Sequence, residues 1–306
     1  MRVAVTGATG TIGGRLVERL LERGDEVTVL SRDDARARRA FGDRVEPVAW
    51  THPKSEPASA AALTGRDAVV HLLGEPIAQR WTNAAKREIR DSRVLGTENL
   101  VRGLAAAQPR PRTLVSQSAE GIYPRGPDPV DEDTEPARGE FLADVVLAWE
   151  GEAAKAGELG MRVVTARTGV VLSRQGGALA KMLPFFKTGV GGPVAGGEQF
   201  VPWIHLDDAV GALLFCLDRE DVHGPVNVTA PRPVTNRELS KALGRALGRP
   251  ASLPVPGFGV RALYGEMAQV VTSGANVQPH RLEQLGYRFE QPKLEPALRN
   301  ATGRGG

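Results

Sequence analysis

The chain has 306 residues, of which 41% are apolar, enough for one large α/β domain with a smaller appended lobe. Its 39 basic and 36 acidic residues leave a net charge of only +3, which argues against nucleic acid as a partner. No apolar run is long enough to span a membrane, so we expect no membrane partner either. With Cys216 as the single cysteine, five scattered histidines and no signal-peptide pattern, the sequence predicts a cytoplasmic protein without disulfides or a metal site.

The first part of the chain alternates short apolar runs with amphipathic stretches. The first amphipathic stretch predicts a helix that begins near Ile12 and ends at Gly24, and further helices are expected at 83–107 and 141–159. The segment 124–136, rich in Pro, Asp and Glu, is expected to be a loop. Strands are expected at 2–6, 27–30, 45–50, 68–73, 113–116 and 162–167. This alternation predicts an α/β fold, a Rossmann domain with a doubly wound parallel sheet, over residues 1–168 with contributions from 200–228.

The pattern changes after residue 168, where glycine-rich loops interrupt it. Asp207 is expected to cap a helix that runs to about residue 217, and a short strand follows at 226–228. Thr235 and Glu238 form a capping box that opens another helix, closed by Gly248. Two more short helices are expected. Residues 169–306 are therefore predicted to form a smaller C-terminal α/β lobe that completes a substrate cleft.

A glycine pattern lies between the first strand and the first helix. Gly7, Gly10 and Gly13 recur at three-residue spacing in the run Thr6-Gly-Ala-Thr-Gly-Thr-Ile-Gly-Gly14. Such glycines permit a tight turn, close approach of the backbone to a pyrophosphate and close packing of helix on strand. The start of the helix then offers free N–H groups to phosphate oxygens. The pattern predicts a dinucleotide site.

The residues at the end of the second strand are expected to determine whether the protein binds NAD or NADP. Ser31 and Arg32 stand there, and a hydroxyl beside a guanidinium suits a ribose 2′-phosphate. Asp33 could instead accept a ribose hydroxyl of NAD, although it lies one step beyond the usual position. We therefore predict NADP(H) as the cofactor. Further along, Arg36, Arg38 and Arg39 are interpreted as a solvated surface.

Several further motifs complete a resemblance that covers essentially the whole chain. With the glycine pattern, they make the chain resemble an atypical extended short-chain dehydrogenase/reductase, and more narrowly the sugar nucleotide epimerase-like family with a C-terminal domain of unknown function. The motifs are His71-Leu-Leu-Gly74, Arg80-Trp-Thr82, Ser92-Arg93 with Thr97, Ser116-Gln-Ser-Ala-Glu-Gly-Ile-Tyr123, Phe141-Leu-Ala143, Trp149-Glu150, Arg167-Thr-Gly-Val-Val-Leu172, Gly191-Gly192, Trp203-Ile-His205, residues 227–231 and Pro233-Val-Thr-Asn236.

The pair of residues that usually performs the chemistry is absent. The general short-chain family transfers a proton from a tyrosine whose pKa is lowered by a lysine four residues later on the same helix. None of the three tyrosines, Tyr123, Tyr264 and Tyr287, has a lysine at that spacing. In the helix expected to carry the pair, a valine and Trp149 occupy the two places.

Two residues of the loop that follows the fifth strand are the candidate catalytic groups. Ser118 matches the family serine and could orient a carbonyl, or it could be a structural loop serine. Tyr123 could be the acid, but nothing near it in the sequence lowers its pKa, and a structural role is equally compatible. Glu120 is an alternative base, and His205 is interpreted as a core or capping histidine.

By resemblance, residues from six parts of the chain approach the cofactor, and two residues of the second lobe line the substrate pocket. The predicted cofactor contacts are Gly7, Thr9, Gly10, Thr11, Ile12, Gly13, Ser31, Arg32, Leu72, Leu73, Gly74, Glu88, Arg93, Ser116, Arg167, Thr168, Gly169 and Val170, and the predicted pocket residues are Gln199 and Trp203.

The sequence supports two functions from different classes. The first is an NADP(H)-binding, epimerase-like oxidoreductase that acts on an unidentified small polar molecule, for which the family serine and the second lobe argue. The alternative is a non-catalytic NADP(H)-binding sensor or interaction module, for which the missing pair argues. A homodimer is compatible with either function.

Overall fold

A parallel sheet of seven strands forms the centre of the protein in the computed structural model, which describes residues 1–304. The strand order is β11-β7-β5-β4-β1-β2-β3, and every neighbouring pair is parallel. From β1 the chain adds β2 and β3 on one side and then β4, β5, β7 and β11 on the other, as in doubly wound folds. The predicted fold class is therefore confirmed. The strands are β1 (Arg2–Thr6), β2 (Glu26–Ser31), β3 (Glu46–Ala49), β4 (Ala68–His71), β5 (Thr113–Ala119), β7 (Arg162–Thr168) and β11 (Gly224–Val228).

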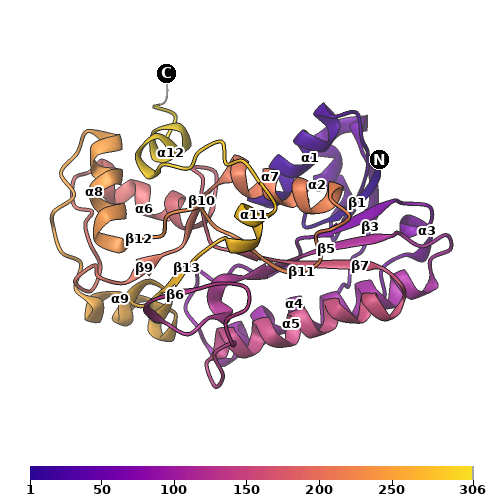
Figure 1. Cartoon of the computed structure of the whole chain (residues 1–306), viewed down its shortest axis with the longest axis horizontal. Helices are drawn as coiled ribbons and strands as arrows, with labels where there is room; N and C mark the ends of the chain where they lie inside the picture. The colour runs from indigo at the N-terminus through magenta and orange to yellow at the C-terminus, as the bar shows by residue number, and fades with distance from the viewer. Residues whose placement is uncertain (305–306) are drawn as a thin grey trace.

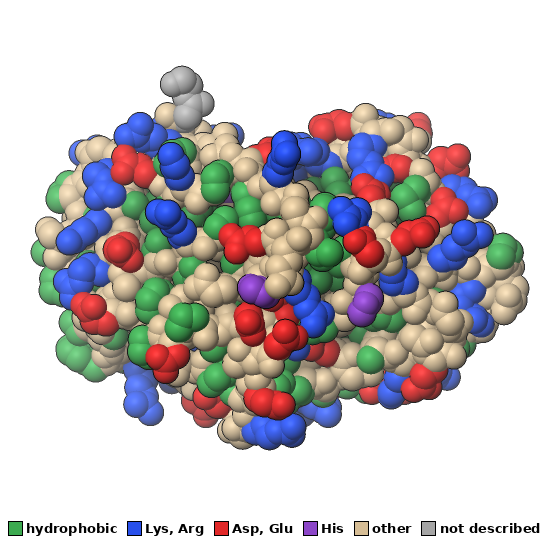
Figure 2. Space-filling model, viewed as in Figure 1, with side chains coloured by type: hydrophobic (Ala, Val, Ile, Leu, Met, Phe, Trp, Pro, Cys, Tyr) green, Lys and Arg blue, Asp and Glu red, His purple; other side chains and the backbone are tan. Residues whose placement is uncertain are grey.

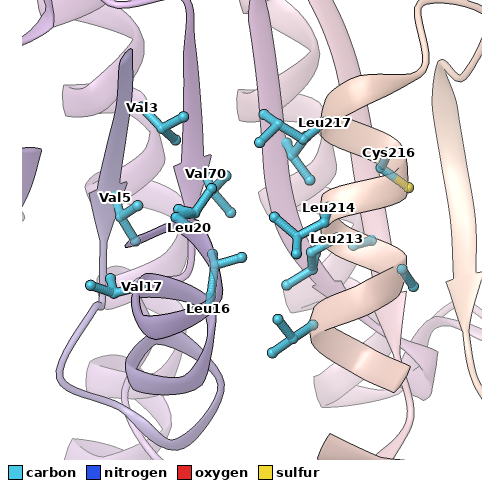
Figure 3. Close-up of a cluster of buried hydrophobic side chains, with 14 of the residues drawn as sticks. Val3, Val5, Leu16, Val17, Leu20, Val70, Leu213, Leu214, Cys216 and Leu217 are labelled. Carbon is cyan, nitrogen blue, oxygen red and sulfur yellow. The ribbon is translucent and has the colours of Figure 1, made fainter. Parts of the chain in front are cut away.

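Helices cover both faces of this sheet (Figure 1). On one face lie α1 (Thr11–Glu22), α2 (Asp34–Phe41) and α7 (Leu206–Asp218), and on the other lie α3 (Ala60–Leu63), α4 (Asn83–Ala106) and α5 (Phe141–Glu158). Because side chains alternate along a strand, Val3 and Val5 of β1 join the core under α1 and α7, whereas Ala4 joins the core under α4 and α5. Figure 3 shows the first of these cores, where Cys216 is fully buried.

The rest of the chain forms short elements beside the sheet. Two-stranded pairs join β10 to β8, β12 to β9 and β13 to β6, and a separate core around Trp203 holds α6, α8 and α12 together. The elements are β6 (Gly126–Val130), β8 (Val170–Leu172), α6 (Gly177–Lys187), β9 (Phe200–Val201), β10 (Trp203–His205), β12 (Val234–Thr235), α8 (Asn236–Leu247), α9 (Gly257–Tyr264), α10 (Gln269–Thr272), β13 (Ala275–Val277), α11 (His280–Gln284) and α12 (Leu294–Ala301), with 3₁₀ turns η1 (Gly42–Arg44), η2 (Glu120–Ile122) and η3 (Gly265–Ala268).

Two local expectations differ from the structure. The helix α7 is capped by His205, whose Nδ1 accepts a hydrogen bond from the Asp207 backbone N–H at 3.2 Å, and not by Asp207. The Asp207 carboxylate instead accepts from Arg15 Nε at 2.7 Å. The segment expected to be a loop at 124–136 contains β6, because a distant strand, β13, supplies its pairing partner. The capping box of Thr235 and Glu238 is present as predicted.

A buried histidine, His71 at the end of β4, connects β1 to α4 by hydrogen bonds next to the β1–α1 turn. The ring of His71 lies between Thr6 Oγ1 (2.7 Å from Nδ1) and Thr97 Oγ1 (3.0 Å from Nε2). The same Thr6 oxygen accepts the backbone N–H of Leu72 at 3.2 Å. Complete burial lowers the pKa of His71 to about 3, so the imidazole is neutral in the folded protein.

This histidine makes stability depend on pH. Its pKa in the folded state lies below the value of about 6.5 in an unfolded chain, so only the unfolded chain takes up a proton as the pH falls below about 6.5. We expect the free energy of unfolding to decrease by up to about 1.4 kcal/mol per pH unit from this group between about pH 6 and pH 4. Urea unfolding of the wild type and of His71→Asn measures the slope, and equal slopes would contradict the assignment.

Two helical glycines provide a matched test of packing. A Cβ on Gly103 of α4 would lie 2.4 Å from the Ala58 carbonyl oxygen, whereas one on Gly151 of α5 would have nothing within 4 Å. We expect Gly103→Ala to lower the free energy of unfolding by about 1–3 kcal/mol through overpacking. Gly151→Ala should raise it by about 0.5–1 kcal/mol because alanine restricts the unfolded chain and favours the helix. Chemical denaturation of both variants checks the opposite signs.

Candidate functional site

The turn between β1 and α1 packs closely against the residues that follow β4. Gly7 has a positive φ of 68°, and a Cβ there would lie 2.4 Å from the Leu72 carbonyl oxygen. A Cβ on Gly13 would lie 2.3 Å from the Gly7 carbonyl oxygen. Both positions therefore exclude a side chain. The helix α1 begins after Gly10, which supplies no side-chain cap, so its first backbone N–H groups remain available to a ligand.

A cavity of about 550 Å³ opens above this turn, at the carboxyl ends of β1, β2 and β4. Its position is the one where parallel α/β sheets bind ligands, and its volume suits a nucleotide. Its walls are Gly7, Ala8, Thr9, Gly10, Leu30, Ser31, Arg32, Asp33, Arg36, Trp50, Pro53, Leu72, Leu73, Gly74 and Pro76.

Two guanidinium groups line one end of this cavity. Neither the Arg32 nor the Arg36 side chain has a hydrogen bond or ion pair to another of the described residues, so both are available to an anion. Asp33 caps α2 by accepting the Arg36 backbone N–H at 2.9 Å, and this cap directs the first turn of α2 toward the cavity. Arg36 is exposed, as its interpretation as solvated surface predicts, and it also lines the cavity, which the sequence did not indicate.

A smaller cavity of about 160 Å³ shares Arg32, Pro53, Leu73 and Gly74 with the larger one. Glu88 lies on its wall, and both of its carboxylate oxygens accept from Lys54 Nζ, at 2.9 and 2.7 Å. The remaining walls are Thr51, His52, Ser55, Glu75 and Ser92. The structure therefore brings the glycine turn, the end of β2, the end of β4 and Glu88 to one region.

Arg93 reaches the end of β4 from α4. Its Nη1 donates to the Glu75 and Ile89 carbonyl oxygens, each at 3.0 Å. Its guanidinium lies over the Trp149 ring, 5.2 Å from the ring centroid, and burial lowers its pKa to about 10. Trp149 is itself buried, and its indole N–H has no partner among the described residues. A cation from α4 thus covers the buried ring of Trp149 on α5.

The two candidate catalytic hydroxyls belong to one buried polar network. Ser118 Oγ donates to Glu150 Oε1 at 2.5 Å, and both Glu150 oxygens bind the Arg167 guanidinium at 2.9 Å. Arg167 Nη1 donates to the Tyr123 hydroxyl at 2.9 Å, and that hydroxyl donates to Asn227 Oδ1 at 2.7 Å. Each hydroxyl thus gives its only proton to another protein group.

The electrostatics of this network make Tyr123 a weak acid. Burial raises the pKa of Tyr123 to about 12, and the neighbouring Arg167 offsets only part of that effect. On the same loop, burial raises the pKa of Glu120, against the opposing charge of Arg125. Glu120 has no side-chain hydrogen bond to another described residue, so its carboxyl group is not committed in the way that Ser118 and Tyr123 are.

The other predicted site residues lie apart from the large cavity. Ser116 is fully buried in β5, and Thr168 to Val170 connect β7 with β8, where a Cβ on Gly169 would lie 2.0 Å from the Pro202 carbonyl oxygen. Gln199 donates to the Val194 and Val271 carbonyl oxygens. Trp203 is 1% exposed in the core of the second lobe and donates to the Arg232 carbonyl oxygen at 3.0 Å.

Neither a metal-binding cluster nor a membrane-spanning helix is present among the described residues. Within residues 1–304, no group of three or more His, Cys, Asp or Glu side chains is arranged to hold a metal ion. No helix in the described part of the chain has the length and apolarity needed to cross a membrane.

Comparison with known proteins identifies the family. Residues 3–229 match the model of the NAD dependent epimerase/dehydratase family, and residues 255–301 match a domain of unknown function, DUF1731. The chain is 41% identical to the chloroplastic homolog of epimerase family protein SDR39U1 from Arabidopsis thaliana, over 98% of this chain and 86% of that protein. It is 36% identical to SDR39U1 from Homo sapiens, over 98% and 99%.

Solved structures agree with this assignment. A crystal structure of human SDR39U1 with NADPH has a TM-score of 0.89 and 35% identity, with 99% of each chain covered. A UDP-glucuronic acid 4-epimerase from Bacillus cereus has a TM-score of 0.81 at 15% identity, which shows a shared fold alone. The chain therefore belongs to the NAD dependent epimerase/dehydratase family and carries a DUF1731 segment near its C-terminus.

Proposed function

We propose that this protein binds NADP(H) and is an epimerase-like oxidoreductase that acts on a small polar substrate. The observation that carries the proposal is the cavity of about 550 Å³, which joins the glycine turn to the two unpaired guanidinium groups of Arg32 and Arg36. The NADPH in the crystal structure of the human relative supports the choice of cofactor.

The residues present fit this cofactor. The N–H groups at the start of α1 would meet the pyrophosphate, and the absence of side chains at Gly7 and Gly13 lets the turn lie close to it. Arg32 and Arg36, with the Ser31 hydroxyl, would hold the 2′-phosphate as charge-assisted donors. A carboxylate alone at this position would repel that phosphate, and Asp33 is engaged in capping α2. A bound nicotinamide would accept and return a hydride.

The substrate would lie between the cofactor-binding domain, residues 1–168 with 200–228, and the lobe formed by the rest of 169–306. In that arrangement the end of β5, with Ser118, and the turn η2 that follows it, with Glu120 and Tyr123, would face the reacting carbon. Ser118 retains lone pairs but gives its proton to Glu150, so it would position a donor group of the substrate rather than donate to a carbonyl. Glu120, with its raised pKa and uncommitted carboxyl group, is the group best suited to move a proton.

A second function is favoured by one observation. The Ser118 and Tyr123 hydroxyls are both held in internal hydrogen bonds, and Trp149 stands in the place of the family lysine. A protein that only senses the NADP(H) redox state, or presents it to a partner, needs no proton donor. This reading predicts cofactor binding without turnover.

A metabolite panel separates the two functions. The protein loaded with NADPH is incubated with small polar carbonyl compounds and sugar nucleotides, and the loss of NADPH absorbance is followed. Oxidation that requires protein and one class of substrate supports the oxidoreductase. Tight NADPH binding with no oxidation by any member, together with a partner interaction that differs between NADP⁺ and NADPH, supports the sensor.

Cofactor choice is tested at the two guanidinium groups. We expect Arg32→Ala and Arg36→Ala each to weaken NADPH binding by about 10-fold or more, because a charge-assisted hydrogen bond to the 2′-phosphate is worth about 1.5–3 kcal/mol. NADH binding should change by less than about twofold, since NADH lacks that phosphate. Calorimetric titration with both nucleotides checks this, with Arg38→Ala as a control of equal charge on the same helix. Equal losses for NADPH and NADH would contradict the assignment.

Ser118 is tested separately from the cofactor. We expect Ser118→Ala to leave NADPH affinity within about threefold, because its hydroxyl is engaged with Glu150 and not with the cavity above the glycine turn. Any turnover found in the metabolite panel should decrease in this variant. A tenfold loss of NADPH affinity would assign Ser118 to the cofactor site instead.

A further inference from the structure

A groove of about 490 Å³ on the outer side of α8 is lined by cations. Arg237, Lys241 and Arg245 project from successive turns of the helix, and Arg249 follows its end. No acidic residue lies among the lining residues, the rest of which are Pro193, Gly244, Gly248, Ala251 and Ser252. We call Arg237, Lys241, Arg245 and Arg249 the basic groove. Arg237 pairs with Glu198 and Arg245 with Glu295, whereas Lys241 and Arg249 have no acidic partner in the described part of the chain.

Large apolar side chains are exposed on the same lobe. Among the described residues, six such side chains are exposed, and all except Met1 fall in the segments 185–190 and 253–263. These five residues, which we call the apolar rim, are Phe185 (58% exposed), Val190 (52%), Leu253 (53%), Phe258 (79%) and Leu263 (72%). Single exposed apolar residues are common on protein surfaces, whereas several large ones grouped in two short segments are unusual and indicate a binding surface.

The basic groove and the apolar rim adjoin each other. The Val255 backbone N–H donates to the Pro193 carbonyl oxygen at 2.8 Å, and the Ala195 N–H donates to the Val255 carbonyl oxygen at 3.0 Å, so the segment 253–263 lies against residues 193–195, which include the groove residue Pro193. Leu253 directly follows the groove residues Ala251 and Ser252. Figure 2 shows basic side chains along the left side of the molecule over α8 and apolar side chains at the lower left over α9.

Cations also alternate with the apolar rim. Lys187 is exposed between Phe185 and Val190, and Arg261 is exposed between Phe258 and Leu263. Neither forms an ion pair with another described residue. The Rossmann domain holds this edge in place, since Arg80 Nη1 caps the end of α9 by donating to the Ala262 (3.0 Å) and Leu263 (3.3 Å) carbonyl oxygens.

We propose that this edge of the C-terminal lobe docks on an anionic lipid surface, with the apolar rim entering the headgroup boundary and the basic groove receiving lipid phosphates. Interfacial segments combine these two features, protruding apolar side chains and flanking unpaired Lys and Arg. The expectation of no membrane partner rested on the lack of a spanning segment, and docking on a surface needs none. A symmetric interface between two copies is disfavoured because it would bring Lys187, Arg261 and the basic groove near their own copies.

Flotation with vesicles tests the proposal on the full chain loaded with NADPH. We expect binding to vesicles of phosphatidylcholine with phosphatidylglycerol, no binding to phosphatidylcholine alone, and loss of binding at high salt. Lys241→Ala and Arg249→Ala should each weaken binding about fivefold, from the attraction of about 1 kcal/mol per cation near such a surface. The double variant Phe258→Ser/Leu263→Ser should weaken it at least about tenfold, since two large side chains would no longer be buried.

The matched control removes the same charge elsewhere. Arg102→Ala and Lys155→Ala lie on α4 and α5 of the Rossmann domain and should leave vesicle binding unchanged. All variants should keep wild-type NADPH affinity and thermal unfolding, because none of these residues lies at the cavity above the glycine turn or in a core. Equal binding to neutral vesicles, no binding to anionic vesicles, or equal loss in the control variants would overturn the proposal. A dimer that Phe258→Ser/Leu263→Ser dissociates, without vesicle binding, would assign the edge to contact between copies instead.

Discussion

The close packing of the β1–α1 turn against the end of β4 is the constraint on which the rest of the site depends. Gly7 and Gly13 allow the turn to lie where any side chain would overlap a backbone carbonyl. The His71 ring then fixes β1 to β4 and to α4 from below, through Thr6 and Thr97. These buried, neutral groups hold the floor of the cavity together by hydrogen bonds, and the free N–H groups of α1 are presented without a competing side chain.

The buried network around Glu150 and Arg167 explains how the fold tolerates the loss of the family pair. A carboxylate and a guanidinium inside a protein are costly unless each is fully hydrogen-bonded, and here Ser118, Tyr123 and Asn227 complete the set. The network joins β5, α5, β7 and β11, so groups that could face a substrate instead connect secondary-structure elements. A proton donor at this site must therefore come from outside the network, and Glu120 is the nearest such group in sequence.

The two lobes have different surfaces. The Rossmann lobe directs its unpaired cations, Arg32 and Arg36, into a cavity, as expected for a small anionic ligand. The C-terminal lobe instead has unpaired cations, Lys241 and Arg249, in an open groove next to large exposed apolar side chains, as expected for an extended partner. Cofactor binding and contact with a surface would thus use two separate sets of residues.

The sequence by itself determined the features that depend on neighbouring residues. Apolar runs located the strands of the sheet, the glycine spacing located the turn, and Thr235 with Glu238 located the start of α8, because each signal acts within a few residues. Only the tertiary structure decided which distant groups meet. Ser118 and Glu150 are 32 residues apart, β6 pairs with β13 across the chain, and Arg36 turns toward the cavity because α2 packs at the end of β2. Such contacts arise from the crossovers of the sheet and the packing of its layers, which no local pattern encodes.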